Sequence, residues 1–253
     1  MNAPPAHPDG RFGLPAHVTA CLFDMDGVLT QTAKVHAAAW KTMFDEFLRR
    51  KTKDSVPFDQ VADYEEFVDG KPRADGVRSF LESRGISLPD GTVDDPAEAE
   101  TVHGLGNRKD GLFMGLIRAQ GAQSYEGSVR YVKTVRGAGL LRAVVSSSAN
   151  CREILRAADI DDLFDEVVDG VIAAREHLSG KPAPDTFLAA ARALGVEAGQ
   201  ASVFEDALAG VAAGKAGGFG YVIGVDRVGQ ADALRQHGAD IVVSDLAELL
   251  PPP

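Results

Sequence analysis

Two pairs of carboxylates stand where the sequence changes abruptly from apolar to charged residues. Asp24 and Asp26 follow one short apolar run, and Glu205 and Asp206 follow another. If the chain stays extended, Asp24 and Asp26 project to one side, where such close carboxylates repel each other unless a cation or proton lies between them. A hard divalent cation such as Mg²⁺ takes such oxygen ligands. The pairs therefore indicate a metal site, and a loop-capping Asp-x-Asp-Gly turn and a helix N-cap are the purely structural alternatives.

Hydroxyl and ammonium groups that could bind a phosphate follow two other segments. Ser146 and Ser147 end an apolar run, and a helix is expected to open near Asn150. A serine hydroxyl and the N–H groups of a helix start are suitable phosphate ligands, although a cluster of N-capping serines has the same pattern. Lys181 lies in a Gly-Lys-Pro-Ala-Pro-Asp segment whose Pro and Asp open the next helix. The lysine is not needed for that purpose, so it is either a phosphate ligand or an ordinary surface residue.

The elements that must position these groups form an alternating pattern after Gly121. The expected strands there span residues 143–145, 166–168, 202–204, 221–225 and 241–243, and the expected helices span residues 129–138, 152–158, 186–194 and 207–216. An earlier strand, residues 18–23, is expected to belong to the same sheet. This alternation is typical of a parallel sheet covered by helices on both faces, and such sheets bind ligands beyond the carboxyl ends of their strands. Asp24, Ser146 and the Glu205-Asp206 pair all belong to that edge.

A helical region interrupts this pattern between the first strand and the rest. From Thr32 onward, apolar residues recur at helical spacing, and further helical patches span residues 75–83 and 108–120. We therefore expect an α/β protein with a Rossmann-like parallel sheet core and an inserted helical cap domain. The core would comprise residues 1–36 and 121–253, and the cap residues 37–120.

The composition restricts the class of protein. Of the 253 residues, 45% are hydrophobic and 25% are charged, which is ordinary for a globular protein. With 37 acidic and 26 basic residues the net charge is −11, so we expect no binding to nucleic acid. No run approaches the ~20 apolar residues of a membrane span, residues 1–20 lack the apolar core of a signal peptide, and Cys21 and Cys151 form no CxxC metal motif. We expect a cytoplasmic monomer without a membrane partner.

The motifs occur in a characteristic order: strand–DxDG, strand–Ser, a GKPxPD loop and strand–ED. In this order they resemble the four motifs of the haloacid dehalogenase-like superfamily, over all of the chain except residues 1–17 and the C-terminal tip. Within that superfamily, the segment from Phe23 to Lys41 is similar to the β-phosphoglucomutase family. The resemblance implies that Asp24 attacks phosphorus and becomes an aspartyl phosphate, and that Asp26 is the general acid and base for the sugar oxygen.

The resemblance also implies which groups bind the metal and the transferring phosphate. Mg²⁺ would be held by Asp24, the main-chain carbonyl of Asp26 and Asp206, with Glu205 in or near its coordination shell. The oxygens of the transferring phosphate would be bound by Ser146, Ser147, Asn150 and Lys181. Such positioning and charge complementarity account for most of the catalysis of phosphoryl transfer.

Residues of the inserted region match the family's spacing as well. The segment 68–73 resembles its phosphate clamp, in which Arg73 would hold the second, non-reacting phosphate. Lys109 resembles a residue of a later cap loop that would reach the sugar or seal the site. The resemblance implies further substrate-binding residues. Thr32 and His36 lie just before the inserted region, and Trp40, Gly70, Arg73 and Lys109 lie within it. From the pattern alone, His36 is a packed core histidine and Arg73 is a surface arginine.

We therefore expect a Mg²⁺-dependent mutase that interconverts β-glucose 1-phosphate and glucose 6-phosphate through an aspartyl phosphate and a bisphosphate. A phosphatase acting on a small phosphorylated sugar or organic acid shares the core motifs, and a non-catalytic phosphosugar-binding regulator is a further alternative that has no need of a nucleophile. The sequence departs from the family's usual residues at Gln31, Asp110, Ala149 and Ala207, and adds polar segments near residues 51–63 and 90–100. These departures leave the sugar specificity open.

Overall fold

The computed structural model describes residues 11–51 and 56–251, which form two compact units. The first unit contains the described residues up to Gln31 and from Gln123 onward, and the second runs from Thr32 to Ala122. The second unit is slightly longer than the expected 37–120, because the whole of its first helix belongs to it. Residues 1–10 and 252–253 of the expected core and 52–55 of the expected insertion lie outside the described part of the chain.

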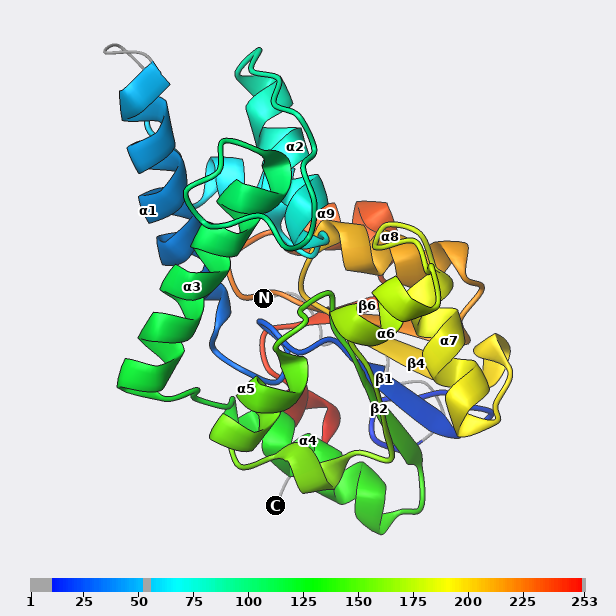
Figure 1. Ribbon diagram of the computed structural model, residues 1–253. Helices are drawn as coiled ribbons and strands as arrows, with labels where there is room; N and C mark the ends of the chain where they lie inside the picture. Colours follow the sequence, from blue (N-terminus) through cyan, green and yellow to red (C-terminus); the bar gives the residue numbers. More distant parts are fainter. Residues whose placement is uncertain (1–10, 52–55, 252–253) are drawn as a thin grey trace. The chain divides into compact units, whose positions relative to one another are not determined.

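The first unit is built on a six-stranded parallel sheet (Figure 1), so the predicted fold class is confirmed. The strands lie in the order β3-β2-β1-β4-β5-β6. Their bounds are Ala20–Phe23 for β1, Leu141–Val145 for β2, Glu166–Val168 for β3, Ala201–Glu205 for β4, Tyr221–Val225 for β5 and Ile241–Val243 for β6. The direction of strand succession reverses between β1 and β4, and ligands bind at such a switch point in open parallel sheets.

The register of the central strands brings their carboxyl ends to one level. Phe23 of β1 pairs with Val144 of β2 and with Phe204 of β4. The backbone N–H of Asp24 donates to the carbonyl of Phe204 at 2.9 Å, which continues the ladder by one residue. Asp24 and Glu205 therefore leave the sheet side by side, although 180 residues of chain separate them.

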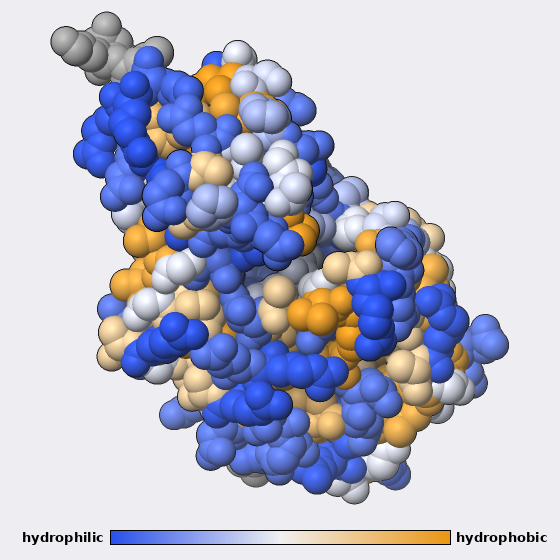
Figure 2. All heavy atoms as spheres, viewed as in Figure 1, coloured by the Kyte–Doolittle hydropathy of each residue, from blue (hydrophilic) through white to orange (hydrophobic). Residues whose placement is uncertain are grey.

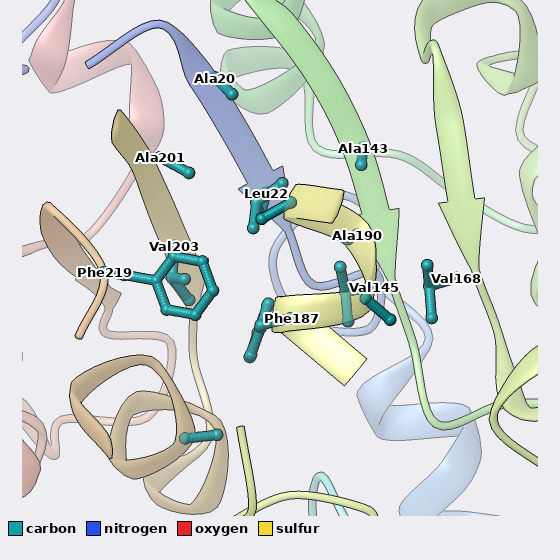
Figure 3. Close-up of a cluster of buried hydrophobic side chains, with 13 residues drawn as sticks. Ala20, Leu22, Ala143, Val145, Val168, Phe187, Ala190, Ala201, Val203 and Phe219 are labelled. Carbon is teal, nitrogen blue, oxygen red and sulfur yellow. The ribbon is translucent and has the colours of Figure 1, made fainter. Parts of the chain in front are cut away.

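Alternate residues of β1 point to opposite faces of the sheet, as the period of a strand requires. On one face, Leu22 packs in a cluster with Phe187 of α7 (Asp185–Leu194) (Figure 3). On the other face, the ring of Phe23 lies 6.3 Å from that of Tyr131 in α4 (Glu126–Gly137). The sheet is thus buried on both faces, which explains why its strands are continuous apolar runs.

Shorter helices complete the first unit. The remaining α-helices are α5 (Cys151–Ala157), α6 (Gly170–Arg175), α8 (Leu208–Ala216) and α9 (Ala231–His237). Helices α6 and α9 were not among the expected helices, and each has fewer than two turns in which to show a periodic pattern. Cys21 and Cys151 are free and buried, and burial raises the pKa of both thiols.

The second unit is helical. It contains α1 (Ala33–Lys51), the π-helical turn η1 (Tyr64–Val68), α2 (Arg73–Ser83) and α3 (Val102–Gln120). Its core is aromatic: the ring of Phe44 lies 5.2 Å from Trp40, 5.3 Å from Phe58 and 4.1 Å from Phe80. The apolar residues that recur at helical spacing in the sequence of α1 therefore form the face that this helix buries.

Helix α3 begins at Val102, earlier than the predicted residue 108. The hydroxyl of Thr101 caps it by accepting a hydrogen bond from the N–H of Gly104 at 2.9 Å. Gly104 and Gly106 have low helix propensity, which concealed this first turn and a half from a reading of the sequence.

Hydrophilic residues predominate on the face shown in Figure 2, and hydrophobic residues form small separate groups among them. The exposed large hydrophobic residues of the described chain are dispersed over both units: Val56, Val61, Val93, Val171 and Val228. Of the helices described, none has the length and apolar character that crossing a bilayer requires.

Candidate active site

Three buried carboxylates meet at the carboxyl ends of β1 and β4. Asp24, Glu205 and Asp206 each have a carboxylate oxygen within 4.8 Å of the others. Their residues are 7%, 0% and 9% exposed, so this is not a solvated acidic surface. The structure thus brings three of the four acidic residues of the two pairs into one cluster, and the carboxylate of Asp26 is not a member of it.

Lys181 is buried against this cluster. Its Nζ forms an ion pair with Asp24, donates to Oε1 of Glu205 at 2.6 Å, and lies 3.3 Å from the carbonyl of Val145. The side chain is 1% exposed, so the alternative of a surface lysine is wrong. Burial alone would lower the pKa of Lys181, but the charges of Asp24 and Glu205 raise it above its usual value, so the ammonium remains protonated.

The charge balance of the cluster favours a further cation. Burial raises the pKa of Asp24 well above its usual value, and the neighbouring Lys181 offsets this only in part. The ammonium of Lys181 pairs with two of the three carboxylates of the cluster, so negative charge remains in excess when all three are ionised. A cation beside Asp24 would favour its ionised form, which is the form that can act as a nucleophile.

Glycines allow the carboxylates to approach the backbone this closely. Gly27 has a φ of 88°, and a Cβ at this position would overlap the carboxylate of Asp206. A Cβ at Gly210 would likewise overlap the carboxylate of Glu205. The backbone therefore leaves room for a compact set of oxygen ligands, and such a set fits Mg²⁺.

The serines that follow β2 bind backbone N–H groups of their own loop. Ser146 is buried, and its hydroxyl accepts a hydrogen bond from the N–H of Ser148 at 3.1 Å. The hydroxyl of Ser148 in turn accepts from the N–H of Asn150, the N-cap residue of α5, at 3.1 Å. Neither hydroxyl caps α5 itself, whose N-cap is Asn150, so the alternative of N-capping serines is not what the structure shows. The hydroxyl proton of Ser146 is left available for a hydrogen bond to an anion.

The second unit brings together three of its predicted residues. The Nζ of Lys109 contacts Nδ1 of His36 and lies 5.0 Å from the ring centre of Trp40 and 4.7 Å from that of Phe113. The ring centre of His36 lies 3.8 Å from that of Phe113 in a stacked arrangement, although His36 is only half-buried. The carbonyl of Thr32 accepts a hydrogen bond from the N–H of His36 at 2.8 Å, which places Thr32 at the start of the same helix.

Arg73 lies at the first position of α2 and is held by α3. Its Nη1 pairs with Asp110 at 2.8 Å, and its Nη2 donates to the side-chain oxygen of Asn107 at 3.1 Å. Gly70 precedes it in a turn with a φ of 68°, a conformation that favours glycine. Asp110, a departure from the family's usual asparagine, thus supplies a counter-ion to Arg73.

Comparison with known proteins identifies the family to which the chain belongs. Residues 18–218, most of the chain, match the model of the haloacid dehalogenase-like hydrolases. The chain belongs to the haloacid dehalogenase-like hydrolase family. It is 56% identical to a β-phosphoglucomutase of Mycobacterium bovis, over 97% of this chain and 98% of the relative. It is 31% identical to a β-phosphoglucomutase of Bacillus subtilis, over 91% of each.

Solved structures lead to the same family. The crystal structure of a β-phosphoglucomutase from Clostridium difficile matches with a TM-score of 0.72 at 25% identity, over 92% of this chain and 93% of that one. The predicted resemblance to this superfamily, and within it to the β-phosphoglucomutases, is confirmed. The protein is an enzyme of this type.

Two residues that were not among the expected site residues bind the backbone of the acidic motifs in this haloacid dehalogenase-like enzyme. Arg227, in the loop after β5, donates from Nε to the carbonyl of Gly27 at 2.8 Å and stacks on the ring of Tyr125 at 3.6 Å. Gln230 of the same loop donates to the carbonyl of Asp206 at 3.1 Å. Both act on the backbone of acidic motifs far away in sequence. The one available signal was that polar residues follow a further strand of the sheet.

Replacing Lys181 by Met should lower the free energy of unfolding by about 3–5 kcal/mol, because it leaves Asp24 and Glu205 buried without their counter-ion. Urea denaturation in the absence of divalent cations measures this loss, and Mg²⁺ should restore part of it. Lys215→Met, at the exposed end of α8, is the matched control and should leave stability nearly unchanged. A Lys181→Met protein as stable as the wild type would show that the carboxyl groups are protonated in the fold.

Proposed function

We propose that this enzyme is a Mg²⁺-dependent phosphosugar mutase that interconverts β-glucose 1-phosphate and glucose 6-phosphate. The observation that carries the proposal is the full-length likeness to a β-phosphoglucomutase, which extends over the second unit as well as the first. Phosphatases of the same family share the core motifs, so the second unit is the part that distinguishes the two activities. We assign phosphoryl transfer to the first unit and the role of a cap domain to the second.

In the proposed reaction, a carboxylate oxygen of Asp24 forms a bond to phosphorus while the bond from phosphorus to the sugar oxygen breaks. Asp26 gives a proton to that departing oxygen. In the reverse direction, a sugar hydroxyl attacks the aspartyl phosphate and Asp26 accepts its proton. The phosphorylated enzyme first converts the monophosphate to a bisphosphate, and Asp24 then takes back the other phosphoryl group. No water is consumed in the cycle.

The buried charges support this chemistry. Lys181 is held by Asp24 and Glu205 and keeps a positive charge beside the proposed nucleophile. We propose that Lys181 and Ser146 bind the oxygens of the transferring group, with Ser147 and Asn150 at the same helix start. Fixed donors of this kind stabilise the charge that spreads over those oxygens in the transition state.

The oxygen cluster fits a magnesium ion. We propose that Asp24, the main-chain carbonyl of Asp26 and Asp206 hold it, with Glu205 in or near the coordination shell. Such an ion neutralises charge on the transferring phosphoryl group. The support is the set of three carboxylates, two of which pack directly against Gly27 and Gly210.

Residues of the second unit would recognise the rest of the substrate. We propose that Arg73 binds the phosphate that is not being transferred, because a planar guanidinium donates two parallel hydrogen bonds to phosphate. Lys109, beside His36 and Trp40, would face the sugar. A mutase needs such a second anion site, since its bisphosphate must be held in two opposite orientations.

A phosphorus NMR time course tests the proposal. The enzyme is incubated with β-glucose 1-phosphate, Mg²⁺ and a trace of the bisphosphate, and glucose 6-phosphate should accumulate without inorganic phosphate. Accumulation of inorganic phosphate would instead establish the phosphatase alternative. An absence of any turnover in the presence of Mg²⁺ would favour the non-catalytic regulator.

A further inference from the structure

The added polar segment in the second unit forms an ordered loop. Residues 89–101 are the later part of the connection between α2 and α3 (Figure 1), and the carboxylate of Asp95 binds two hydroxyls within them. Its two oxygens accept hydrogen bonds from the hydroxyls of Thr92 at 2.9 Å and Thr101 at 2.6 Å. These bonds lower the pKa of Asp95, so its carboxylate is ionised at neutral pH. The loop therefore has a defined backbone of its own.

The backbone of this loop fixes the side chain of Asn107. Both bonds come from Nδ2 of Asn107, which donates to the carbonyl of Val93 at 3.0 Å and to the carbonyl of Asp95 at 2.8 Å. An amide NH₂ has two donors, and each of these carbonyls accepts one. The orientation of the amide is thereby set, and its oxygen is directed to the opposite side, toward Arg73. The next residue, Arg108, donates to the carbonyl of Ala97 at 2.9 Å, which ties the loop to α3 a second time.

The oxygen of Asn107 accepts a hydrogen bond from Nη2 of Arg73 at 3.1 Å. Asp110 holds the other terminal nitrogen, Nη1, at 2.8 Å. The stem of Arg73 passes over Gly106, where a Cβ would lie 3.2 Å from its Cγ and 3.4 Å from its Nε. The guanidinium is therefore oriented by successive positions of one helix, while the side chain remains 36% exposed and accessible to an anion.

We propose that Asn107 is a positioning residue: loop 89–101 fixes the side chain of Asn107, and Asn107 in turn orients the guanidinium of Arg73. This orientation determines how tightly the second unit binds the non-reacting phosphate. A guanidinium already held in place loses less conformational entropy when it binds a phosphate. Asp110 alone leaves the guanidinium free to rotate about the Nη1 contact, whereas two acceptors fix its plane. The inference rests on the proposed role of Arg73 in phosphosugar binding, and it gives a function to a segment that phosphoryl transfer does not use.

Kinetics of three variants test the role of Asn107. Asn107→Leu should raise the KM for β-glucose 1-phosphate roughly 10- to 100-fold, the range for loss of a hydrogen bond to a charged group, with a much smaller change in kcat. Asn107→Asp should also raise KM, because its carboxylate faces the carbonyls of Val93 and Asp95 without a donor. Asp94→Leu, at an exposed position of the same loop, is the matched control and should retain the wild-type KM.

Acetyl phosphate separates positioning from general damage. It carries no second phosphate, so its phosphorylation of Asp24 should proceed at the wild-type rate in Asn107→Leu. Arg73→Ala provides the reference for complete loss of the clamp. Asn107→Leu with a wild-type KM would overturn the inference while leaving the mutase proposal intact, and so would an equal loss with both phosphodonors. A wild-type protein that turns over no sugar phosphate overturns the proposed function and the inference with it.

A double-mutant cycle tests whether the loop acts through Asn107. Asp95→Leu removes the acceptor of Thr92 and Thr101 and should raise KM in the same direction as Asn107→Leu, by a smaller factor. The double variant should be no worse than Asn107→Leu alone, because residues that act through one contact are not additive. Full additivity of the two effects on KM would show that the loop does not act through Asn107.

Discussion

Replacing Asp24 by Asn should reduce turnover of β-glucose 1-phosphate on the order of 10⁴- to 10⁶-fold, the range seen when a member of a catalytic triad is removed. An amide oxygen is a poor nucleophile toward phosphorus, and no other described carboxylate occupies the position at the end of β1. The fold should survive, because Asn has almost the same shape and its oxygen can still accept from Lys181. Phosphorus NMR measures the turnover, and mass spectrometry after treatment with acetyl phosphate shows whether the phosphoenzyme forms.

Two controls make the Asp24 result specific. Asp232→Asn changes an aspartate that is 92% exposed in its side chain, and it should leave turnover unchanged. Chelation of divalent cations should abolish turnover in the wild type and be reversed by added Mg²⁺. An Asp24→Asn enzyme with wild-type turnover would exclude the aspartyl phosphate mechanism, and full turnover in the chelator would exclude the metal.

Asp26→Asn should lower kcat about 10²- to 10⁴-fold, the usual contribution of general acid and base catalysis. Its effect on the affinity for Mg²⁺ should be small, because the carboxylate of Asp26 is not part of the buried oxygen cluster. The loop around it is held by backbone contacts, such as the N–H of Gly27 to the carbonyl of Thr30 at 2.8 Å, so the geometry should persist. Steady-state kinetics and calorimetric titration with Mg²⁺ give the two quantities separately.

Each of the two measurements on Asp26→Asn has a result that would contradict the role of Asp26 as acid and base. Retention of most wild-type turnover would show that Asp26 is only a loop residue. A loss of Mg²⁺ affinity in step with the loss of turnover would show that its carboxylate is a metal ligand, and the assignment as acid and base would then fail.

The sequence by itself determined the α/β architecture and the order of its motifs. A strand buried on both faces must be a continuous apolar run, and the ends of such runs placed Asp24 and Ser146 at the carboxyl edge of the sheet. The apolar face of α1 that includes Trp40 and Phe44 could also be predicted from the sequence, because a helix repeats its buried positions every turn. These features are local, and the physical requirement of each is met by residues close together in the chain.

Only the tertiary structure decided how these groups are paired. The residues around Lys181 are compatible with a surface lysine, yet its side chain lies buried between Asp24 and Glu205. The reason is that β1 and β4 are adjacent in the sheet, and the loop that precedes α7 reaches the same edge. Arg227, like Lys181, acts on residues that are distant in sequence. Such contacts depend on strand order and on the close approach of backbones, which no local period of the sequence encodes. The residue types thus indicate which chemical groups the site contains, whereas the packing of the sheet determines which charged groups pair with one another.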